Sequence, residues 1–204
     1  MELDHLAVSA ETLAEGVEYI EDLLGVKTNL GGQHALMGTH NRLLSLGPSL
    51  YLEIIAIDPE APDPGRSRWF DLDNFSGSPR LTNWIVRTDD LAAARSAAPL
   101  GIGTEMALSR GDLRWRMLVP DNGQLPFGGA YPALIAWDSA GHPATRLQDC
   151  GCWLEKLHVL HPNSEDLADF LGVEAEMASV SVELADRVGL MAEIKTPRGC
   201  VTLL

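Results

Sequence analysis

The sequence lacks a long apolar run. No apolar stretch approaches the roughly 18 residues that a membrane-spanning helix needs. The first residues, MELDHLAVSA, also lack the basic segment and the apolar centre of a secretory signal peptide. We therefore expect a soluble, cytoplasmic protein that does not act in or on a membrane.

Basic residues are scarce. The 204-residue chain has 15 Lys and Arg against 29 Asp and Glu, which gives a formal net charge of −14. Such an excess repels phosphate backbones, so we expect no nucleic-acid partner. The acidic residues are scattered rather than gathered in one block, which is typical of a solvated surface.

Cysteines are few and odd in number. The chain has three, Cys150, Cys152 and Cys200, and reduced thiols are the default outside oxidising compartments. Cys150 and Cys152 form a C-x-C pair, which can ligate a metal, but no second pair lies nearby. We expect small buried or partly buried thiols.

The hydrophobic pattern predicts a β-α-β-β-β unit over residues 1–58. Apolar alternation indicates strands at 3–10 and 49–58, and the apolar spacing of 11–26 indicates an amphipathic helix that ends at Gly25. Between them lies a hairpin, GGQHALMGTHNRLLSLG, with Gly38 at the turn and His40 at its tip.

The same pattern then repeats. A Pro- and Gly-rich connector, 59–80, precedes a second unit over 81–140, in which LTNWIVRTDDLA aligns with the earlier LDHLAVSAETLA. A shorter unit of similar order fills 141–204. The sequence therefore predicts an α+β fold of repeated βαβββ units within one compact domain.

These motifs together resemble a known superfamily. The opening LDHLAV, the G-x-H-x-x-x-G-T-x-N-x-L hairpin and the strand YLEIIAIDP are similar to the glyoxalase-like domain subfamily of the vicinal oxygen chelate superfamily. That superfamily includes glyoxalase I, extradiol dioxygenases and bleomycin-binding proteins. The resemblance implies sheets curled into a half-open barrel around a cleft, and a homodimer is common among such relatives.

The resemblance also implies a metal site. The first strand of a unit commonly supplies a His ligand and the last strand a Glu, and these places hold His5 and Glu53. An ionised carboxylate on an apolar strand is costly unless it is paired or bound to a metal. Imidazole with carboxylate suits Zn, Mn, Fe or Ni. The alternative is a satisfied His–carboxylate pair with a structural role.

The second unit departs from this ligand pattern. Asn83 stands where a second His is expected, and the place that matches Glu53 falls at Ala133 or Leu134. Neither can complete a four-ligand site. His34, on the hairpin, is therefore a candidate third ligand or a general base.

Four further residues are candidates for substrate binding. Thr39 and Asn41 could hold substrate oxygens, or they could cap backbone groups of the turn. Trp137 is the expected wall of an apolar cleft, and His142 is a candidate polar anchor from the second unit.

Three hypotheses follow. The first is an enzyme with His5, Glu53 and His34 as metal ligands and His34 and Glu53 as catalytic groups, acting on a small oxygenated molecule as a lyase, isomerase or ring-cleaving dioxygenase. The second is a metal-free protein that sequesters or senses a small molecule. In the third, the His–Glu pair is structural and the cleft is a dimer interface.

Overall fold

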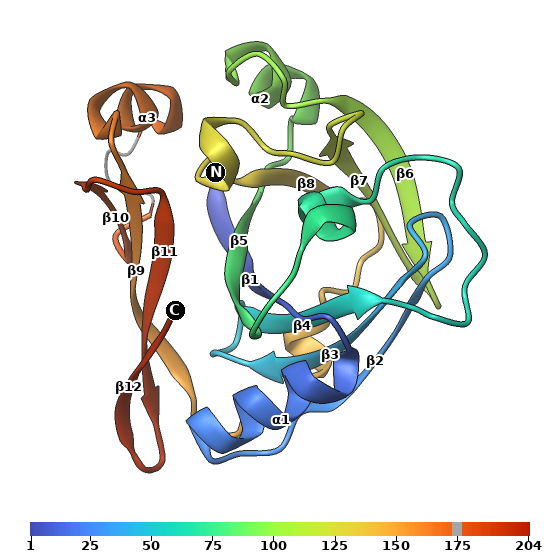
Figure 1. Cartoon of the computed structure of the whole chain (residues 1–204), viewed down its shortest axis with the longest axis vertical. Helices are drawn as coiled ribbons and strands as arrows, with labels where there is room; N and C mark the ends of the chain where they lie inside the picture. Colours follow the sequence, from blue (N-terminus) through green and yellow to red (C-terminus); the bar gives the residue numbers. More distant parts are fainter. Residues whose placement is uncertain (173–176) are drawn as a thin grey trace.

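The computed structural model describes residues 1–172 and 177–204. Two sheets account for the strands of the described residues (Figure 1). The larger has eight strands in the order β2-β3-β4-β1-β5-β8-β7-β6 and is curled, and the smaller has four in the order β10-β9-β11-β12. The predicted α+β class and half-open barrel are confirmed.

The first unit supplies half of the curled sheet. Its elements are β1 (Glu2–Ser9), α1 (Leu13–Leu24), β2 (Asn29–His34), β3 (Thr39–Ser45) and β4 (Tyr51–Ile57). Thr12 caps the start of α1 by accepting a hydrogen bond from the backbone of Glu15, and Gly25 ends the helix with a left-handed backbone. The helix therefore ends where the sequence predicted.

The hairpin turn lies earlier than predicted. Thr39, His40 and Asn41 belong to β3, so the turn occupies 35–38 and His40 is not at its tip. Gly38 closes the turn with a φ of 58°. The polar side chains of β3 are thereby fixed on a paired strand, with alternate residues facing the inside of the barrel.

The second unit repeats these elements. They are β5 (Arg80–Arg87), α2 (Leu91–Ala97), β6 (Thr104–Arg110), β7 (Leu113–Val119) and β8 (Ala133–Trp137). The antiparallel pairing of β1 with β5 joins the units at the centre of the sheet. Short 3-10 helices lie in the connections: η1 (Trp69–Asn74), η2 (Phe127–Gly129) and η3 (Pro143–Arg146).

Helix α1 packs on the outer face of the sheet. Gly16 is buried, and a Cβ there would lie 2.6 Å from Cγ2 of Ile54 on β4. A glycine in a helix is unfavourable by about 1 kcal/mol, which close packing against the sheet offsets here. Because side chains alternate along β4, Glu53 points to the opposite, inner face.

The third unit has the same elements in a different arrangement. It consists of β9 (Trp153–His161), α3 (Ser164–Leu171), β10 (Val180–Leu184), β11 (Gly189–Thr196) and β12 (Gly199–Leu203). In the first two units the last strand pairs with the first, β4 with β1 and β8 with β5, whereas β9 pairs with β11. The third unit is therefore not a structural copy of the other two.

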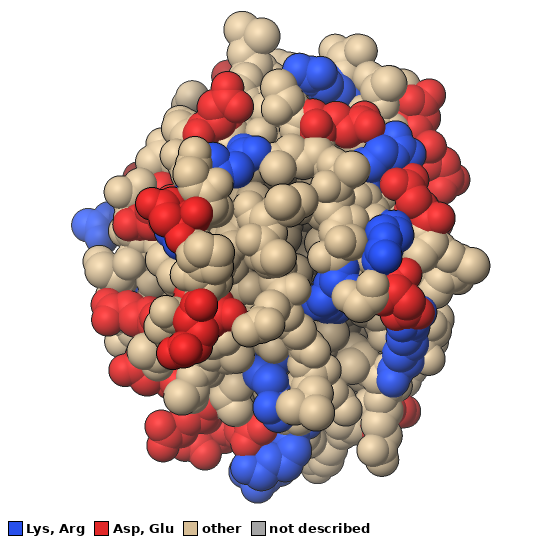
Figure 2. Space-filling model, turned by 90° about the vertical axis from the view of Figure 1, so that its right-hand side faces the viewer, with Lys and Arg blue, Asp and Glu red and all other residues tan. Residues whose placement is uncertain are grey.

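The charged surface agrees with the composition, whereas one of the three thiols predicted to be buried or partly buried, Cys200, is exposed. Charged side chains are spread over the face in Figure 2, with uncharged residues across the hollow at its centre. The cysteines are free thiols, with Cys152 buried and Cys200 exposed. Among the described residues, no helix is long and apolar enough to cross a membrane.

Candidate functional site

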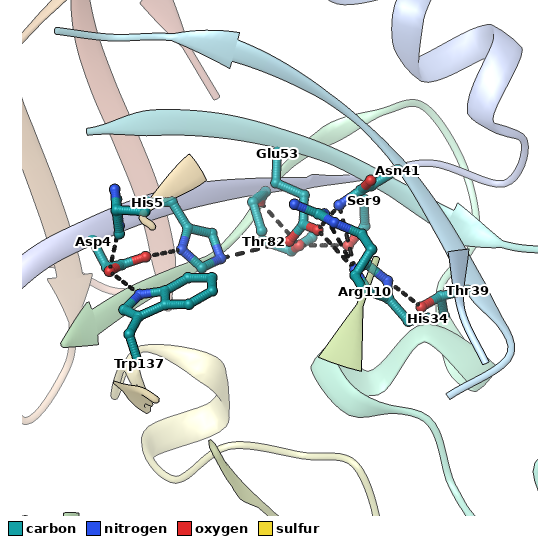
Figure 3. A network of polar contacts seen from close by, with 12 residues as sticks. Asp4, His5, Ser9, His34, Thr39, Asn41, Glu53, Thr82, Arg110 and Trp137 are labelled. Atoms are coloured by element: carbon teal, nitrogen blue, oxygen red, sulfur yellow. Dashed lines mark hydrogen bonds and ion pairs between the residues drawn. The ribbon is translucent and has the colours of Figure 1, made fainter. Parts of the chain in front are cut away.

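The strands β1 and β4 carry the centre of the site. Their parallel register pairs His5 with Tyr51 and Ala7 with Glu53, so all four side chains face the inside of the barrel. The His5 and Tyr51 rings are stacked with centroids 4.4 Å apart. The sequence prediction that His5 and Glu53 share a face is therefore met in the structure (Figure 3).

A bulge in β1 brings Asp4 beside His5. The register against β5 runs from Leu3 opposite Val86 to His5 opposite Ile85, which leaves Asp4 without a partner. Such an extra residue bends the strand and redirects side chains. Asp4 Oδ1 therefore lies 2.6 Å from His5 Nδ1, although neighbouring residues of a regular strand point to opposite faces.

The second oxygen of Asp4 is also occupied. Oδ2 accepts hydrogen bonds from Trp137 Nε1 at 2.9 Å and His142 Nε2 at 3.0 Å. His142 Nδ1 accepts from the backbone N–H of Ala144, so its ring proton is on Nε2. Burial alone would raise the pKa of Asp4, but hydrogen bonds from His142 and His5 outweigh it and lower the pKa. Asp4 is thus ionised and fixes the His5 ring.

His5 and Glu53 form a buried ion pair. His5 Nε2 lies 3.6 Å from Glu53 Oε2, and both side chains are almost fully buried. Burial alone would lower the pKa of His5, but its contacts with Asp4 and Glu53 raise it. Burial would raise the pKa of Glu53, whereas the contact with His5 lowers it to about 2. The pair is charged near neutral pH.

Asn41 fixes the other oxygen of Glu53. Its Oδ1 accepts from the backbone N–H of Gly32 at 2.8 Å, which orients Nδ2 toward Glu53 Oε1 at 2.5 Å. The register of β2 against β3 shifts by one residue at the two glycines. A Cβ at Gly31 would overlap Asn41 Oδ1. Gly31 therefore makes room for Asn41.

His34 is neutral and accepts hydrogen bonds toward the cleft. Its Nε2 lies 3.4 Å from both Asn41 Nδ2 and Arg110 Nη1, which are N–H donors. The ring proton is therefore on Nδ1, which donates to Thr39 Oγ1 at 3.0 Å. Burial lowers the pKa of His34 to about 4. The edge of the ring contacts Trp69, with centroids 5.0 Å apart.

These groups line a narrow cleft with a volume of about 20 Å³, room for roughly one water molecule. Its polar lining includes His5, His34, Tyr51, Glu53 and Arg110. Its aromatic walls include Trp69, Phe70, Trp115 and Trp137. Trp137 thus lies where the sequence placed it, but a substrate needs side chains of the wall to move aside.

Three predicted substrate-binding residues do not line this cleft. They are Thr39, Asn41 and His142, which lie behind the cleft. Thr39 bonds to His34 and Asn41 bonds to Glu53, and both of these partners line the cleft. His142 bonds to Asp4, which holds the ring of His5. Their polar atoms are engaged by neighbouring buried groups, which is the supporting arrangement expected of buried polar side chains. Their predicted direct contact with a substrate stays a prediction.

The second unit does not complete a metal site. Asn83 pairs with Ala7 and Ala133 pairs with Ile85, so the register selects Ala133 as the place that matches Glu53. An alanine has no ligand atom, and an amide is a poor substitute for the imidazole of a metal site.

The first unit alone does not fit an ion either. His34 Nε2, a predicted ligand atom, faces the N–H groups of Asn41 and Arg110, and the Arg110 charge would repel a cation. His5 and Glu53 then remain as only two ligands. Within the described part of the chain, no three His, Cys, Asp or Glu side chains are arranged to hold a metal. The predicted Zn, Mn, Fe or Ni site is therefore not supported by the donor geometry.

Sequence reasoning missed Asp4, Tyr51 and Arg110 as site residues. Asp4 had a signal, since an acidic residue in an apolar strand beside a His needs a partner. Arg110 had none, because it lies at the end of β6 and reaches His34 across the barrel.

Comparisons with known proteins agree with this fold. A crystal structure of a hypothetical protein from Staphylococcus aureus is similar with a TM-score of 0.65 and 15% identity, covering 92% of this chain and 87% of that chain. At this identity the likeness shows the fold alone. No curated protein matches the chain significantly.

Two enzymes show weaker likeness. Methylmalonyl-CoA epimerase from Mycobacterium tuberculosis has a TM-score of 0.44 at 22% identity, covering 69% of this chain and 89% of that chain. A triple mutant of 4-hydroxymandelate synthase from Streptomyces coelicolor has a TM-score of 0.48 at 14% identity, covering 98% and 61%. At such scores neither likeness supports an inference about activity.

The family itself follows from the sequence match. The family model described as a glyoxalase-like domain matches residues 3–174, most of the chain. Two βαβββ units joined into a curled half-barrel are also the arrangement expected of the superfamily. The chain belongs to the glyoxalase-like domain family and has the vicinal oxygen chelate fold.

Proposed function

We propose that the cleft is the active site of an enzyme that moves a proton on a small, anionic carbonyl compound without a resident metal. The observation that carries this proposal is the buried Asp4–His5–Glu53 chain, which lies in the same cleft as the guanidinium of Arg110. It provides an acid, a base and a cation within one enclosed site.

Stability alone does not account for this chain of charges. Removing ionised groups from water costs several kcal/mol per ion, and apolar residues of similar volume often stabilise a core as well or better. Charged groups whose pKa values are strongly shifted, in a cleft with aromatic walls, are typical of functional sites. The arrangement therefore favours a role in chemistry.

The proposed step is proton abstraction next to a carbonyl. The C–H bond breaks, its proton moves to Glu53 Oε2, and the electron pair moves onto the carbonyl oxygen to give an enolate. His5 Nε2–H donates to that oxygen, and Arg110 pairs with the substrate's carboxylate or the developing negative charge. Glu53 faces one side of the substrate, so it returns the proton to the same carbon, which gives exchange with solvent, or, in an enediol, to the neighbouring carbon, which gives an isomer.

Substrate binding would make Glu53 a stronger base. Burial by itself raises the pKa of Glu53, and the contact with His5 is the main cause that lowers it, with smaller contributions from His34 and Asn41. When His5 turns its N–H to a substrate oxygen, burial remains and the pKa of Glu53 rises. The indole Nε1 of Trp69 is a buried donor without a partner among the described residues, so it is available to a second substrate oxygen.

The test is exchange of substrate protons with deuterium oxide, followed by NMR. A panel of 2-oxo acids, 2-hydroxy acids and 1,2-dicarbonyl compounds is incubated with the protein. We expect deuterium next to a carbonyl in at least one compound, and a loss of about 10²-fold or more in rate for Glu53→Gln and His5→Gln. Glu105→Gln, an exposed acid on β6, is the matched control and should keep the rate. An unchanged rate in Glu53→Gln would refute the proposal.

The metal-dependent alternative is tested on the same positions. It rests on the proximity of the three predicted ligands, since the Nε2 atoms of His5 and His34 lie 3.6 Å and 3.9 Å from the carboxylate oxygens of Glu53. Metal content is measured on protein purified without a histidine tag, and on His5→Ala and Glu53→Ala. A near-stoichiometric divalent metal that both variants lose would replace the metal-free mechanism by a metal-dependent one.

The binding-protein alternative has a separate signature. The three tryptophans of the cleft suit the capture of an apolar ring, as in metal-free sequestration. A compound of the panel that quenches tryptophan fluorescence and shows no proton exchange in wild-type protein would favour this function.

A further inference from the structure

A second, larger cavity adjoins the cleft. It has a volume of about 680 Å³, large enough for a small organic molecule. Its walls come from the connector around η1, from β5, from the loop around η2 and from the start of β11. We call it the Asn83 cavity. The β11 wall lies beyond residue 174, outside the part of the chain that matches the family.

Asn83 gives this cavity an unsatisfied polar group. The residue is only 3% exposed, lines the cavity, and its Oδ1 has no hydrogen-bond partner among the described residues. Asn83 pairs with Ala7, two residues along β1 from His5, so it faces the same inside of the barrel as His5. A buried carbonyl oxygen without a partner is unfavourable and indicates a missing donor.

The charged residues of the cavity already have partners. Asp71 accepts hydrogen bonds from Asn74 and Gln124, and Arg80 donates to the backbone carbonyls of Ser76 and Ser78. The rest of the wall includes apolar side chains such as Leu81, Leu125 and Leu190. The cavity therefore suits an uncharged molecule with an apolar body and one N–H or O–H donor.

Phe70 separates the cavity from the cleft, since it lines both. Phe70 and Asp71 have φ values of 60° and 55°, a left-handed backbone that is strained for residues other than glycine. The strained segment is held by the hydrogen bond from the backbone N–H of Asp71 to the carbonyl of Gly123. Phe70 is thus a wall that a local backbone change could move.

We propose that the Asn83 cavity binds the uncharged, hydrogen-bond-donating tail of the substrate, whose reactive end passes Phe70 to reach His5 and Glu53. The identity of the reactive end rests on the proposed function above. The tail site does not, because its evidence is the cavity and the unpartnered oxygen of Asn83. The narrow cleft then needs to hold only the reacting atoms.

The probes are N-benzylhexanamide and benzyl hexanoate. They differ by one group, since the N–H of the amide is an oxygen in the ester. In an NMR titration we expect wild-type protein to bind the amide about tenfold more tightly than the ester, because only the amide donates to Asn83 Oδ1. Asn83→Leu should remove this preference. Equal binding of both probes by the wild type, or binding of neither, would overturn the tail site.

A second variant tests the site in case Asn83→Leu does not fold. Val188 is half-exposed at the edge of the cavity, so Val188→Trp leaves the core intact and narrows the opening. Val188→Trp should weaken the binding of both probes to a similar extent and keep the preference for the amide over the ester. Unchanged binding in Val188→Trp would show that the probes bind elsewhere and would contradict the proposal.

Phe70→Ala tests the link between the two spaces. In wild-type protein the amide should leave the ring signals of His34 unshifted, and in Phe70→Ala it should shift them. Phe70→Leu repeats the test with a smaller loss of packing. Unshifted His34 signals in both variants would refute the link. A confirmed amide preference without proton exchange would leave the tail site standing and refute the proposed function alone.

Discussion

At the scale of single residues, the site consists of shared hydrogen bonds. Asp4 serves three donors, and Glu53 is held by His5 on one oxygen and Asn41 on the other. The carboxylates of Asp4 and Glu53 are therefore held in fixed orientations by their neighbours, which suits the proposed acid–base chemistry.

His34 should make stability depend on pH. Its pKa is about 4 in the folded state against an ordinary 6.5, so the unfolded chain takes up a proton first. This contribution is complete above about pH 6.5 and decreases as the pH falls toward 4. Between about pH 7 and pH 5 we expect a loss of about 2 kcal/mol in the free energy of unfolding that His34→Gln does not show. Urea denaturation measures it, and parallel pH profiles would contradict it.

Asp4→Asn should destabilise the fold. The amide has one acceptor oxygen in place of two, so donors from His5, Trp137 and His142 lose partners inside the protein. We expect a loss of about 3 kcal/mol in the free energy of unfolding. Asp121→Asn, an exposed acid, is the control and should change stability little. A loss below about 1 kcal/mol for Asp4→Asn would mean that the network relaxes around the amide.

At the scale of elements, two bulges shape the site. One in β1 redirects Asp4, and one in β2 places Gly31 and Gly32 against Asn41. Irregularities of this kind are common next to active sites, because they re-aim a side chain without breaking the sheet.

Gly31→Ala tests the β2 bulge. The new Cβ would overlap Asn41 Oδ1, so Asn41 must move and release Glu53. We expect a loss of about 2 kcal/mol in the free energy of unfolding. Gly189→Ala is the control, since its Cβ would meet Leu160 at an ordinary 3.8 Å. Equal stability of the two variants would show that the bulge tolerates a side chain.

At the scale of the whole molecule, two units form one barrel and a third forms a separate sheet. The cleft lies inside the barrel, while the start of β11 closes the Asn83 cavity from outside it. The predicted division into units at 58, 80 and 140 and the predicted homodimer stay predictions. Light scattering would measure the oligomeric state.

The net charge should make stability depend on salt. A charge of −14 repels itself in the folded state, and salt screens this repulsion. We expect the melting temperature to rise by about 2–5 °C between about 0.01 M and 0.3 M NaCl. Differential scanning calorimetry checks this. A fall with salt would mean that surface ion pairs outweigh the net repulsion.

The sequence by itself determined the elements and their repeat. Apolar periods, the glycine that ends the first helix and the turn glycine are local features of the chain, so local physics sets them. The same period of two placed His5 and Glu53 on one face. The fold class and the centre of the site are therefore predictable from the amino-acid sequence.

Only the tertiary structure decided the chemistry of the cleft. Asp4 joins His5 because of a bulge against β5, and Arg110 reaches His34 from a strand of the other unit. The same barrel aligns Ala133 with the place of Glu53 and leaves Asn83 Oδ1 without a partner among the described residues. Pairing between distant strands sets these contacts, and no local pattern of residues encodes it.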